Sequence, residues 1–593
     1  MTRTPLRPLA RILAARRAGE NPDAIERENL RARHEADRDA ARQRAEGRLL
    51  VLGISFLCAF AMVALKISLL AASDPAEPRA AVSGAQIVAA RADITDRNGR
   101  ILATNLTTHS LYAQPQQMVD PIRAAKELVQ VFPDLDEDRL IRQFTGKRKF
   151  IWIKRRISPE QQQAVFDIGD PGLLFGPREM RLYPNGRLAA HVLGGAGFGR
   201  EGVSSAEVIG VAGIEKALDA ELRDPGRGDV PLTLSLDLTV QAAVERVLEG
   251  GMRLMNAKGA AAVLMDIHTG EVISLASLPD FDPNDRPVPL TEGDPGDSPL
   301  FNRAVQGVYE LGSTFKIFAA AQGIEERLVS RSTMIDITGP LTWGRHRIRD
   351  FRNYGKELTV EDVIVKSSNI GTARIAMMIG PDRQQEFLSN LGLFAPTPLE
   401  LLEAPGARPL LPKKWSEIHT MTVSYGHGIS ASPLHLAAAY SSLLNGGLAV
   451  TPTLLKREEY TPGPRVVSED TSRQAREMLR LVVSRGTASL GDVQGYRVGG
   501  KTGTADKARP QGGYYEDKVI ATFATVFPAD DPAYVLVVTL DEPVETSGKE
   551  PRRTAGWTAV PVAAEVIRRI APLLGLAPAV EPVDEVGVTL ASN

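Results

Sequence analysis

Residues 49–65 read LLVLGISFLCAFAMVAL and contain no charged side chain. A run of seventeen such residues is at the short end of what a helix needs to cross a bilayer, and it lengthens if Lys66 extends its amine to the interface. A buried core helix is one alternative, and a signal peptide cleaved near residues 71–73 is another. The length of the apolar run and of the leader before it argues against cleavage. The sequence therefore predicts an uncleaved transmembrane helix over residues 49–72.

Arginine is concentrated before this helix. Residues 1–48 carry twelve arginines, no lysine and eight acidic residues. Because positive charge marks the cytoplasmic flank of a membrane helix, this tail is predicted to be cytoplasmic and the chain after about Asp74 to lie outside. The tail has no sustained apolar face, which indicates a flexible or loosely helical segment.

The length, net charge and cysteine content of the chain limit its possible folds and functions. Its 593 residues exceed what one core holds, so two or more domains are expected. A net charge of −2 shows no bias toward nucleic acid. The single cysteine, Cys58, excludes an intrachain disulfide and any multi-cysteine metal site. We expect no metal, no other cofactor and no nucleic-acid partner.

Changes in composition divide the chain. The linker at 73–84 leads to short β-like runs around the turn Asp-Arg-Asn-Gly at 96–99. A Gly/Pro loop at 224–229 leads into a second region, where helices and strands alternate up to a helix at 560–575. Within it, residues 259–284 are predicted to form a β-hairpin whose turn is the stretch His-Thr-Gly. The predicted parts are a cytoplasmic tail (1–48), a transmembrane helix (49–72), a strand-rich pedestal (80–228), an α/β or α+β domain (229–576) and a disordered tail (577–593).

A serine precedes a lysine by three residues in the stretch YELGSTFKIFAAAQG, at Ser313 and Lys316. On a helix the two share one face, so the hydroxyl and the amine can meet, and a helix start favours negative charge on a nucleophile. A lysine serves as a base only if its pKa falls. The pattern Ser-x-x-Lys occurs by chance about two or three times in a chain of this size, so by itself it favours an ordinary buried helix.

Two further stretches change this balance. Ser367-Ser368-Asn369 stands beside an apolar helix, and Lys501-Thr502-Gly503-Thr504 begins a predicted strand. The three motifs lie in the order Ser-x-x-Lys, Ser-x-Asn, Lys-Thr-Gly within about 190 residues of one domain. This ordered set is typical of penicillin-binding proteins and class A β-lactamases.

The chain resembles a class B penicillin-binding protein, a bitopic peptidoglycan D,D-transpeptidase, from about residue 88 to 576. Its overall length and short linker most resemble the division-specific, septal member of that family. Leu311 stands where the family often has proline, and His427 where glutamine is frequent; neither touches the three motifs, and no role follows for His427. Further similar stretches are RADITDRNGRILA, YPNGRLAAHVLG, GVAGIEKALDAEL, SYGHGISASPLHLAAAYSSLLNGG and TAGWTAVPV.

The resemblance implies catalytic roles. Ser313 would attack a D-Ala-D-Ala peptide and form an acyl-enzyme, with Lys316 as the neutral base. Ser367 would relay the proton to the leaving D-alanine, and Lys501 would hold Ser367 and supply positive potential. Asn369 would orient Lys316 and the substrate amide.

It also implies substrate contacts. Thr502 and Thr504 would bind the terminal carboxylate, and the backbone N–H groups of Ser313 and Thr504 would form the oxyanion hole. Glycine at 503 would let the strand approach the substrate closely. The acyl group would then pass from Ser313 to an amine of a second stem peptide, which in this family is the side-chain amine of a diamino acid. β-Lactams would also acylate Ser313.

The implied fold is a multidomain α+β chain with a single N-terminal transmembrane helix, a strand-rich pedestal and a transpeptidase domain whose antiparallel sheet lies between helical layers. The implied location is the inner membrane, with the N-terminus cytoplasmic and the catalytic domain periplasmic. Partners would be stem peptides, β-lactams, a SEDS-family glycosyltransferase and other division-complex membrane proteins.

Several alternatives stay open at this stage. A serine β-lactamase shares the motifs, but it is normally shorter and soluble, and no convincing Glu-x-x-Leu-Asn stretch is present to supply its deacylating glutamate. A β-lactam-sensing receptor normally has several membrane spans, and a silent scaffold would have lost part of the motif set. The elongation-specific member of the same family is the nearest alternative.

Overall fold

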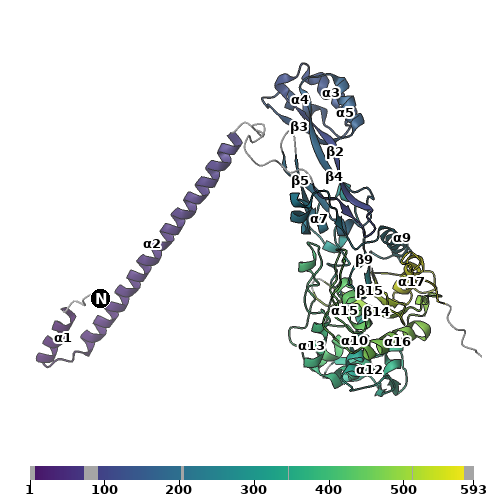
Figure 1. Cartoon of the computed structure of the whole chain (residues 1–593). Coiled ribbons are helices and arrows are strands. Elements are labelled where there is room, and N and C mark those ends of the chain that lie inside the picture. The colour runs from purple at the N-terminus through teal and green to yellow at the C-terminus, as the bar shows by residue number, and fades with distance from the viewer. Residues whose placement is uncertain (1–6, 73–90, 202–205, 345, 510–511, 580–593) are drawn as a thin grey trace, which may run out of the picture. The chain divides into compact units, whose positions relative to one another are not determined.

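The computed structural model describes residues 7–72, 91–201, 206–344, 346–509 and 512–579 (Figure 1). The predicted linker at 73–84 and most of the predicted tail at 577–593 lie outside these residues. The chain forms two compact units, which are described separately. The first comprises residues 1–79, 112–153 and 163–174, and the second comprises 80–111, 154–162 and 175–593.

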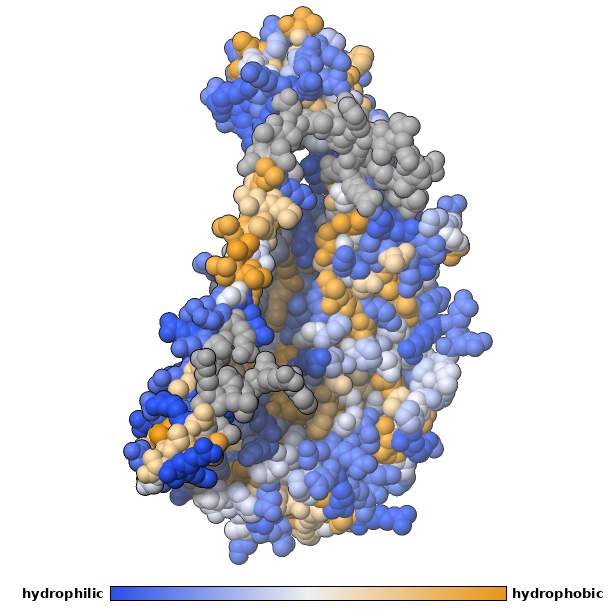
Figure 2. All heavy atoms as spheres, turned by 90° about the vertical axis from the view of Figure 1, so that its left-hand side faces the viewer, coloured by the Kyte–Doolittle hydropathy of each residue, from blue (hydrophilic) through white to orange (hydrophobic). Residues whose placement is uncertain are grey.

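The N-terminal part of the first unit is helical. Helix α1 spans Arg7–Arg17, and one long helix, α2, spans Asp23–Ala72. The apolar stretch Glu46–Lys66 is long and apolar enough to cross a membrane, and none of it is buried in the protein. In Figure 2 this part of α2 is an orange band that continues into a blue, polar stretch. One helix of this kind is found among the described residues.

The Arg-rich segment before the apolar run is part of the same helix. The flexible or loosely helical tail expected from the sequence is therefore a regular helix from Asp23 onward. Alanine, arginine and glutamate, which dominate this segment, have high helix propensity, and Arg42 pairs with Glu46 one turn away at 2.8 Å.

The rest of the first unit is a small α+β head. Asp120 and Asp136 cap two helices by accepting hydrogen bonds from the backbone N–H groups of Arg123 (3.0 Å) and Arg139 (2.6 Å). Tyr112 packs against Phe150, with ring centroids 5.0 Å apart. The head contains α3 (Pro121–Val131) and α4 (Glu137–Phe144), and β2 (Ile101–Ala113), β3 (Ile151–Ile157), α5 (Pro159–Ile168) and β4 (Leu173–Leu182) run from one unit into the other.

The second unit begins with strands. The two-residue strand β1 (Ile94–Thr95) pairs antiparallel with β2 and parallel with β7 (Leu232–Thr233). The predicted turn at 96–99 joins β1 to β2, and the Asp96 carboxylate accepts hydrogen bonds from the backbone N–H groups of Asn98 and Arg100 at 2.9 and 2.8 Å. Here too belong the hairpin β5 (Gly195–Glu201) and β6 (Ala206–Ala212) and the short helices α6 (Ala190–Leu193), α7 (Gly213–Ala217) and α8 (Asp219–Leu222).

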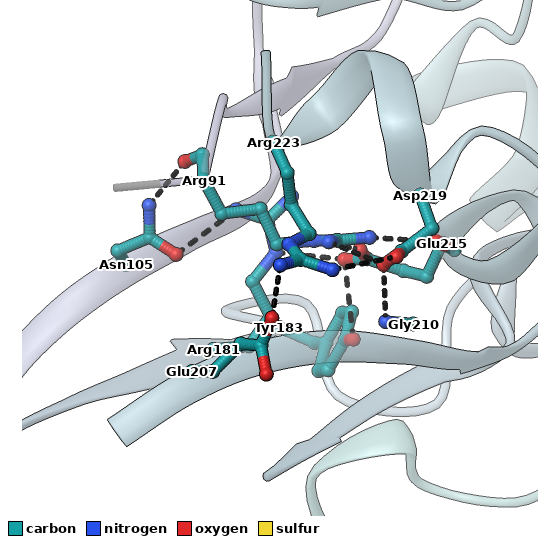
Figure 3. Close-up of polar contacts among 9 residues, drawn as sticks. All are labelled: Arg91, Asn105, Arg181, Tyr183, Glu207, Gly210, Glu215, Asp219 and Arg223. Carbon is teal, nitrogen blue, oxygen red and sulfur yellow. Dashed lines mark hydrogen bonds and ion pairs between the residues drawn. The ribbon is translucent and has the colours of Figure 1, made fainter. Parts of the chain in front are cut away.

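A buried charge cluster joins Arg91, which precedes β1, and Arg181 on β4 to carboxylates on α7 and α8 (Figure 3). The Arg91 guanidinium contacts a carboxylate oxygen of Glu215 and one of Asp219, each at 2.7 Å. The Arg181 guanidinium contacts the other Glu215 oxygen at 2.7 Å, and Tyr183 donates its hydroxyl to that oxygen at 3.2 Å. The side chains of Arg91 and Glu215 are fully buried. Glu215 is therefore the shared counterion of two buried arginines.

Replacing Glu215 with glutamine should destabilise the protein strongly. The change keeps the side-chain shape but leaves two buried guanidinium groups without their shared carboxylate, a loss of about 3–5 kcal/mol in the free energy of unfolding. Thermal unfolding of the detergent-purified chain measures this. As a control, Glu565→Gln removes a partly exposed carboxylate that pairs with Arg569 one turn away, and it should cost less than about 1 kcal/mol. Equal effects of the two substitutions would contradict the prediction.

The larger part of the second unit is built on one five-stranded antiparallel sheet, in the order β14-β15-β16-β8-β9. Strands β8 (Gly259–Asp266) and β9 (Val272–Leu278) form the hairpin predicted for this stretch, and nearly all their residues are buried. Continuous apolar strands of this kind need cover on both faces. The other strands of the sheet are β14 (Gly499–Ala508), β15 (Tyr514–Phe527) and β16 (Tyr534–Asp541).

Helices supply that cover (Figure 1). Helices α9 (Leu238–Leu254) and α17 (Ala559–Ile570) pack together on one face, and α15 (Pro433–Leu444) and α16 (Glu469–Arg485) pack on the other with α10 (Lys316–Glu325). The predicted antiparallel sheet between helical layers is confirmed. The remaining elements are α11 (Val360–Val365), α12 (Asn369–Ile379), α13 (Pro381–Asn390), α14 (Glu417–Ser424), and the short strands β10 (Met334–Asp336), β11 (Leu341–Trp343), β12 (His346–Ile348) and β13 (Glu357–Thr359).

Candidate active site

A cleft of about 1070 Å³ opens on the second unit. The edge strand β14, the turn before α10, the segment between α11 and α12, and the loop after α14 all contribute to its walls. Five predicted site residues line it: Ser313, Ser367, Asn369, Thr502 and Thr504. Lys316 and Lys501 are fully buried. Residues that lie far apart in the sequence are thus brought to one place.

Ser313 lies in a short 3₁₀ turn, Gly312–Phe315, and α10 begins only at Lys316. The sequence predicted an α-helix start at the serine. In a 3₁₀ turn residues i and i+3 are eclipsed, so the serine and the lysine still share a face. Tyr440 donates its hydroxyl to the carbonyl of Thr314 at 2.7 Å, which fixes the turn from below.

Two glycines allow the turn Gly312–Phe315 to pack closely against β14 and the loop after α14. Gly312 has φ +57°, and a Cβ there would lie 2.9 Å from the carbonyl oxygen of Thr504. Gly426 has φ +76°, and a Cβ there would lie 2.0 Å from the carbonyl oxygen of Gly312. Only glycine fits at both positions. The turn that carries Ser313 can therefore lie directly between β14 and the loop after α14.

Lys316 reaches the residue that opens the second motif. Its Nζ donates to the carbonyl of Ser367 at 2.5 Å and to the Ser367 hydroxyl at 3.0 Å. Burial, together with the positive charge of Lys501, holds the pKa of Lys316 well below its usual value, although Asp350 opposes this shift. A buried lysine with a low pKa can be neutral and accept a proton.

Ser367 stands between two amines. Lys501 Nζ lies 2.9 Å from the Ser367 Oγ, and Lys316 Nζ lies 3.0 Å from the same atom. Burial lowers the pKa of Lys501 to about 7. Ser367 has φ +61°, a left-handed conformation that is unusual for a residue with a side chain and that is found most often at functional sites.

Asn369 begins α12 and faces the cleft. Its backbone N–H donates to the Asp350 carboxylate at 2.6 Å, and its side-chain amide donates to the carbonyl of Arg349 at 2.9 Å. Asp350 also accepts from the hydroxyl of Ser368 at 2.7 Å. Among the described contacts, the predicted one between Asn369 and Lys316 is not made.

The Lys-Thr-Gly-Thr stretch lies on β14 at the cleft edge. The Thr502 hydroxyl contacts the hydroxyl of Thr487 at 2.9 Å, and the Thr504 hydroxyl accepts from the backbone N–H of Ala555 at 2.9 Å. A Cβ at Gly503 would lie 2.1 Å from the carbonyl oxygen of Leu311. Glycine at this position therefore makes room for the segment that carries Ser313, a contact that the sequence alone does not predict.

Sequence reasoning missed three further groups. Asp350 caps α12, Thr487 holds Thr502, and Glu310 contacts His427 at 2.9 Å on the cleft wall. From the sequence, His427 is only a departure from the family pattern, at a position where glutamine is frequent. Among the described residues, no group of three or more His, Cys, Asp or Glu side chains could hold a metal ion.

A serine on a cleft wall, three residues before a buried lysine of lowered pKa, together with a second serine that bonds to that lysine and to another, defines an enzyme that transfers acyl groups through a serine ester. The comparisons identify the family. Residues 260–567 match the penicillin-binding protein transpeptidase domain, and residues 86–227 match the penicillin-binding protein dimerisation domain. The chain belongs to the penicillin-binding protein family and is a penicillin-binding transpeptidase, as the resemblance implied.

Known peptidoglycan transpeptidases and penicillin-binding proteins are similar to this chain over most of its length. The chain is 37% identical to the probable peptidoglycan D,D-transpeptidase FtsI of Caulobacter vibrioides over 501 residues, 82% of each chain. It is 30% identical to the peptidoglycan D,D-transpeptidase FtsI of Escherichia coli over 489 residues, 77% of this chain and 80% of the relative. The crystal structure of penicillin-binding protein 3 from Mycobacterium tuberculosis with aztreonam matches with a TM-score of 0.62 at 27% identity, covering 83% of this chain and 97% of that one.

Proposed function

We propose that this protein is the peptidoglycan D,D-transpeptidase that cross-links stem peptides at the division septum. The observation that carries the chemistry is the Ser367 hydroxyl, held between the amines of Lys316 and Lys501 at 3.0 and 2.9 Å beside the Ser313 turn. The septal role is supported by the relatives named FtsI.

In the proposed mechanism Ser313 Oγ attacks the carbonyl between two D-alanines and gives its proton to neutral Lys316. Because Ser367 Oγ bonds to Lys316, the proton passes through that hydroxyl to the nitrogen of the departing D-alanine. The C–N bond breaks and an ester on Ser313 remains. Lys501 fixes Ser367 and adds positive potential when protonated.

The proposed carboxylate site is the part of β14 that lines the cleft. Thr502 and Thr504 both face the cleft, and Lys501 lies buried behind them. Two hydroxyls near an ammonium suit a terminal carboxylate. The hydrogen bond between the hydroxyls of Thr487 and Thr502 would orient the Thr502 hydroxyl toward the substrate.

A donor peptide that ends in a free D-alanine carboxylate should acylate Ser313 much faster than its amidated analogue. A charge-assisted hydrogen bond contributes about 1.5–3 kcal/mol, so the expected ratio is roughly 10- to 100-fold. Thr502→Val should shrink the ratio. Thr522→Val, which removes a buried hydroxyl that bonds to Thr539 in the same sheet, should leave it unchanged. Mass spectrometry of the intact protein gives the rates, and equal rates for the acid and the amide would refute the site.

The chain is membrane-anchored through α2, and we further propose that it lies in the inner membrane with the Arg-rich segment in the cytoplasm. The positive charge on that side of the apolar stretch supports this orientation. The proposed catalytic side is the periplasm. A SEDS-family glycosyltransferase and other division proteins are the proposed membrane partners, and copurification in detergent tests the pairing.

Two fusions test orientation and cellular role. A fluorescent protein that matures only in the cytoplasm, joined before the N-terminal helix, should be bright and should gather at the division site. The same protein joined after Gly575 should stay dark. Signal along the lateral wall would favour the elongation-specific alternative, and a bright C-terminal fusion would overturn the orientation.

A further inference from the structure

Three side chains from separate segments meet on the cleft wall beside the proposed nucleophile. His427 Nδ1 lies 2.9 Å from one carboxylate oxygen of Glu310. The other oxygen accepts hydrogen bonds from the Tyr514 hydroxyl at 2.9 Å and from the backbone N–H of Gly428 at 2.8 Å. The rings of His427 and Tyr514 lie 5.3 Å apart. We call Glu310, His427 and Tyr514 the cleft-wall cluster.

The backbone holds this cluster close to Ser313. Glu310 precedes Ser313 by three residues. Tyr309 and Ala431 exchange two backbone hydrogen bonds on one side of the cluster, at 3.0 and 2.9 Å, and Gly312 donates to the carbonyl of Gly426 on the other, at 3.3 Å. The loop that carries His427 is thus hydrogen-bonded at both ends to the segment that carries Ser313.

The cluster leaves one imidazole nitrogen unused. If Nδ1 carries the proton and donates it to Glu310, Nε2 keeps its lone pair, and no hydrogen bond to Nε2 is found among the described residues. The His427 side chain is 47% exposed, whereas that of Glu310 is 11% exposed. A carboxylate that fixes the ring of a cleft-lining, partly exposed histidine and leaves its other nitrogen without a partner among the described residues is the arrangement of a general base.

The cleft has room and charge for a second substrate. Its volume of about 1070 Å³ exceeds what one small ligand commonly fills. Charges are unevenly placed along its walls: Glu310 and Asp506 flank His427, while the remaining lining includes a basic group formed by Arg347, Arg349, Arg352, Lys366 and Arg485. A cationic amine is therefore attracted to the His427 side.

We propose that His427 is the catalytic base that deprotonates the acceptor amine, with Glu310 as its positioning residue. This inference rests on the proposed function, because it concerns the second half of the same reaction. It gives a role to a histidine that stands where glutamine is frequent in similar proteins.

The step balances without another reagent. The acceptor ammonium gives one proton to Nε2 of His427, and the free amine attacks the ester carbonyl on Ser313. The new C–N bond forms as the C–Oγ bond breaks, and the second amine proton reaches Ser313 Oγ through Lys316 and Ser367. The imidazolium then releases its proton to solvent.

The pH dependence has a definite sign. The groups that act on His427 are Glu310 before the turn that carries Ser313, Asp506 on β14 and Tyr514 on β15, and Tyr425 lines the same cleft. The hydrogen bond to Glu310 raises the pKa of His427, partial burial opposes the rise, and the charges of Glu310 and Asp506 add to it. Below this pKa the ring is protonated and cannot accept, so aminolysis rises as the pH rises through it.

Partitioning of the acyl-enzyme tests the role. The full-length protein in detergent is acylated by a D-alanyl thioester and offered a tripeptide that ends in a diamino acid with a free side-chain amine. Mass spectrometry measures the amide product and the hydrolysed product. Substitution of His427 by glutamine should lower the ratio of amide to acid about 100-fold, because general-base catalysis contributes about 10²–10⁴-fold, while acylation stays within about twofold.

The pH profile separates a base from a structural residue. For His427→Gln, aminolysis should lose its rise near the histidine pKa and follow the ionisation of the amine itself. Glu310→Gln should move the rise to lower pH, because the carboxylate no longer raises the pKa of His427. As a control, Asp530→Asn removes a surface carboxylate that pairs with Arg497 at 3.4 Å, and it should change neither the ratio nor the profile.

Two outcomes overturn the inference: an unchanged ratio and profile in His427→Gln, or an equal loss of acylation and aminolysis, which means that the residue only supports the fold. Stoichiometric labelling by a fluorescent penicillin checks that each variant is folded. A wild-type protein that fails to acylate at Ser313 would instead refute the proposed function.

Discussion

Replacing Ser313 with alanine should abolish covalent labelling of the purified protein by a fluorescent penicillin. In the proposed mechanism the acyl bond forms on the Ser313 oxygen, whereas the other hydroxyl of this turn, that of Thr314, is buried and donates to the carbonyl of Leu311 at 2.9 Å. The loss should be complete rather than partial, because a missing nucleophile cannot be replaced by better binding. Gel fluorescence and intact-protein mass spectrometry measure the label.

A second serine on the same cleft is the matched control. Ser489 lines the cleft but lies outside all three motifs, so Ser489→Ala should label like the wild-type protein. The unfolding temperature of Ser313→Ala should stay near that of the wild type. Normal labelling of a folded Ser313→Ala variant would show that the nucleophile has been misassigned.

Replacing Lys316 with methionine should reduce acylation by about three orders of magnitude without unfolding the protein. The buried amine is the proposed proton acceptor, and general-base catalysis contributes about 10²–10⁴-fold. Methionine keeps much of the apolar stem and removes a cationic group that burial and Lys501 both disfavour. Because the lowered pKa of the buried amine costs stability wherever the unfolded chain would be protonated, its removal should leave the free energy of unfolding at neutral pH unchanged or higher.

The exposed Lys356 provides the control, since Lys356→Met should leave acylation within about twofold. The wild type should lose acylation only when the pH falls below the lowered pKa of Lys316, where the amine is protonated. Because the unfolded chain binds more protons between that pKa and about 10.4, the free energy of unfolding should rise with pH over this window, and less steeply in Lys316→Met. A wild-type acylation rate for Lys316→Met would contradict the assignment.

Local sequence was sufficient for features that depend on nearby residues. The seventeen-residue apolar run predicted a helix that could cross a membrane, and the β8–β9 hairpin followed from two apolar runs around a short turn. The helical form of residues 23–48 was underestimated because propensity was given less weight than the missing apolar face. The order of the three motifs identified the family, because that order is a known pattern of penicillin-binding proteins.

The sequence by itself thus predicted which residues carry the chemistry, because the residue types and their order are fixed in the chain. Only the tertiary structure decided how they meet. Ser367 is 51 residues from Lys316 and 134 from Lys501, and their contacts depend on the sheet and helices that pack between them. The same holds for the three segments that build the cleft-wall cluster and for Arg91, which is 124 residues from Glu215. Such contacts arise from the close packing of whole elements, and no local pattern encodes them.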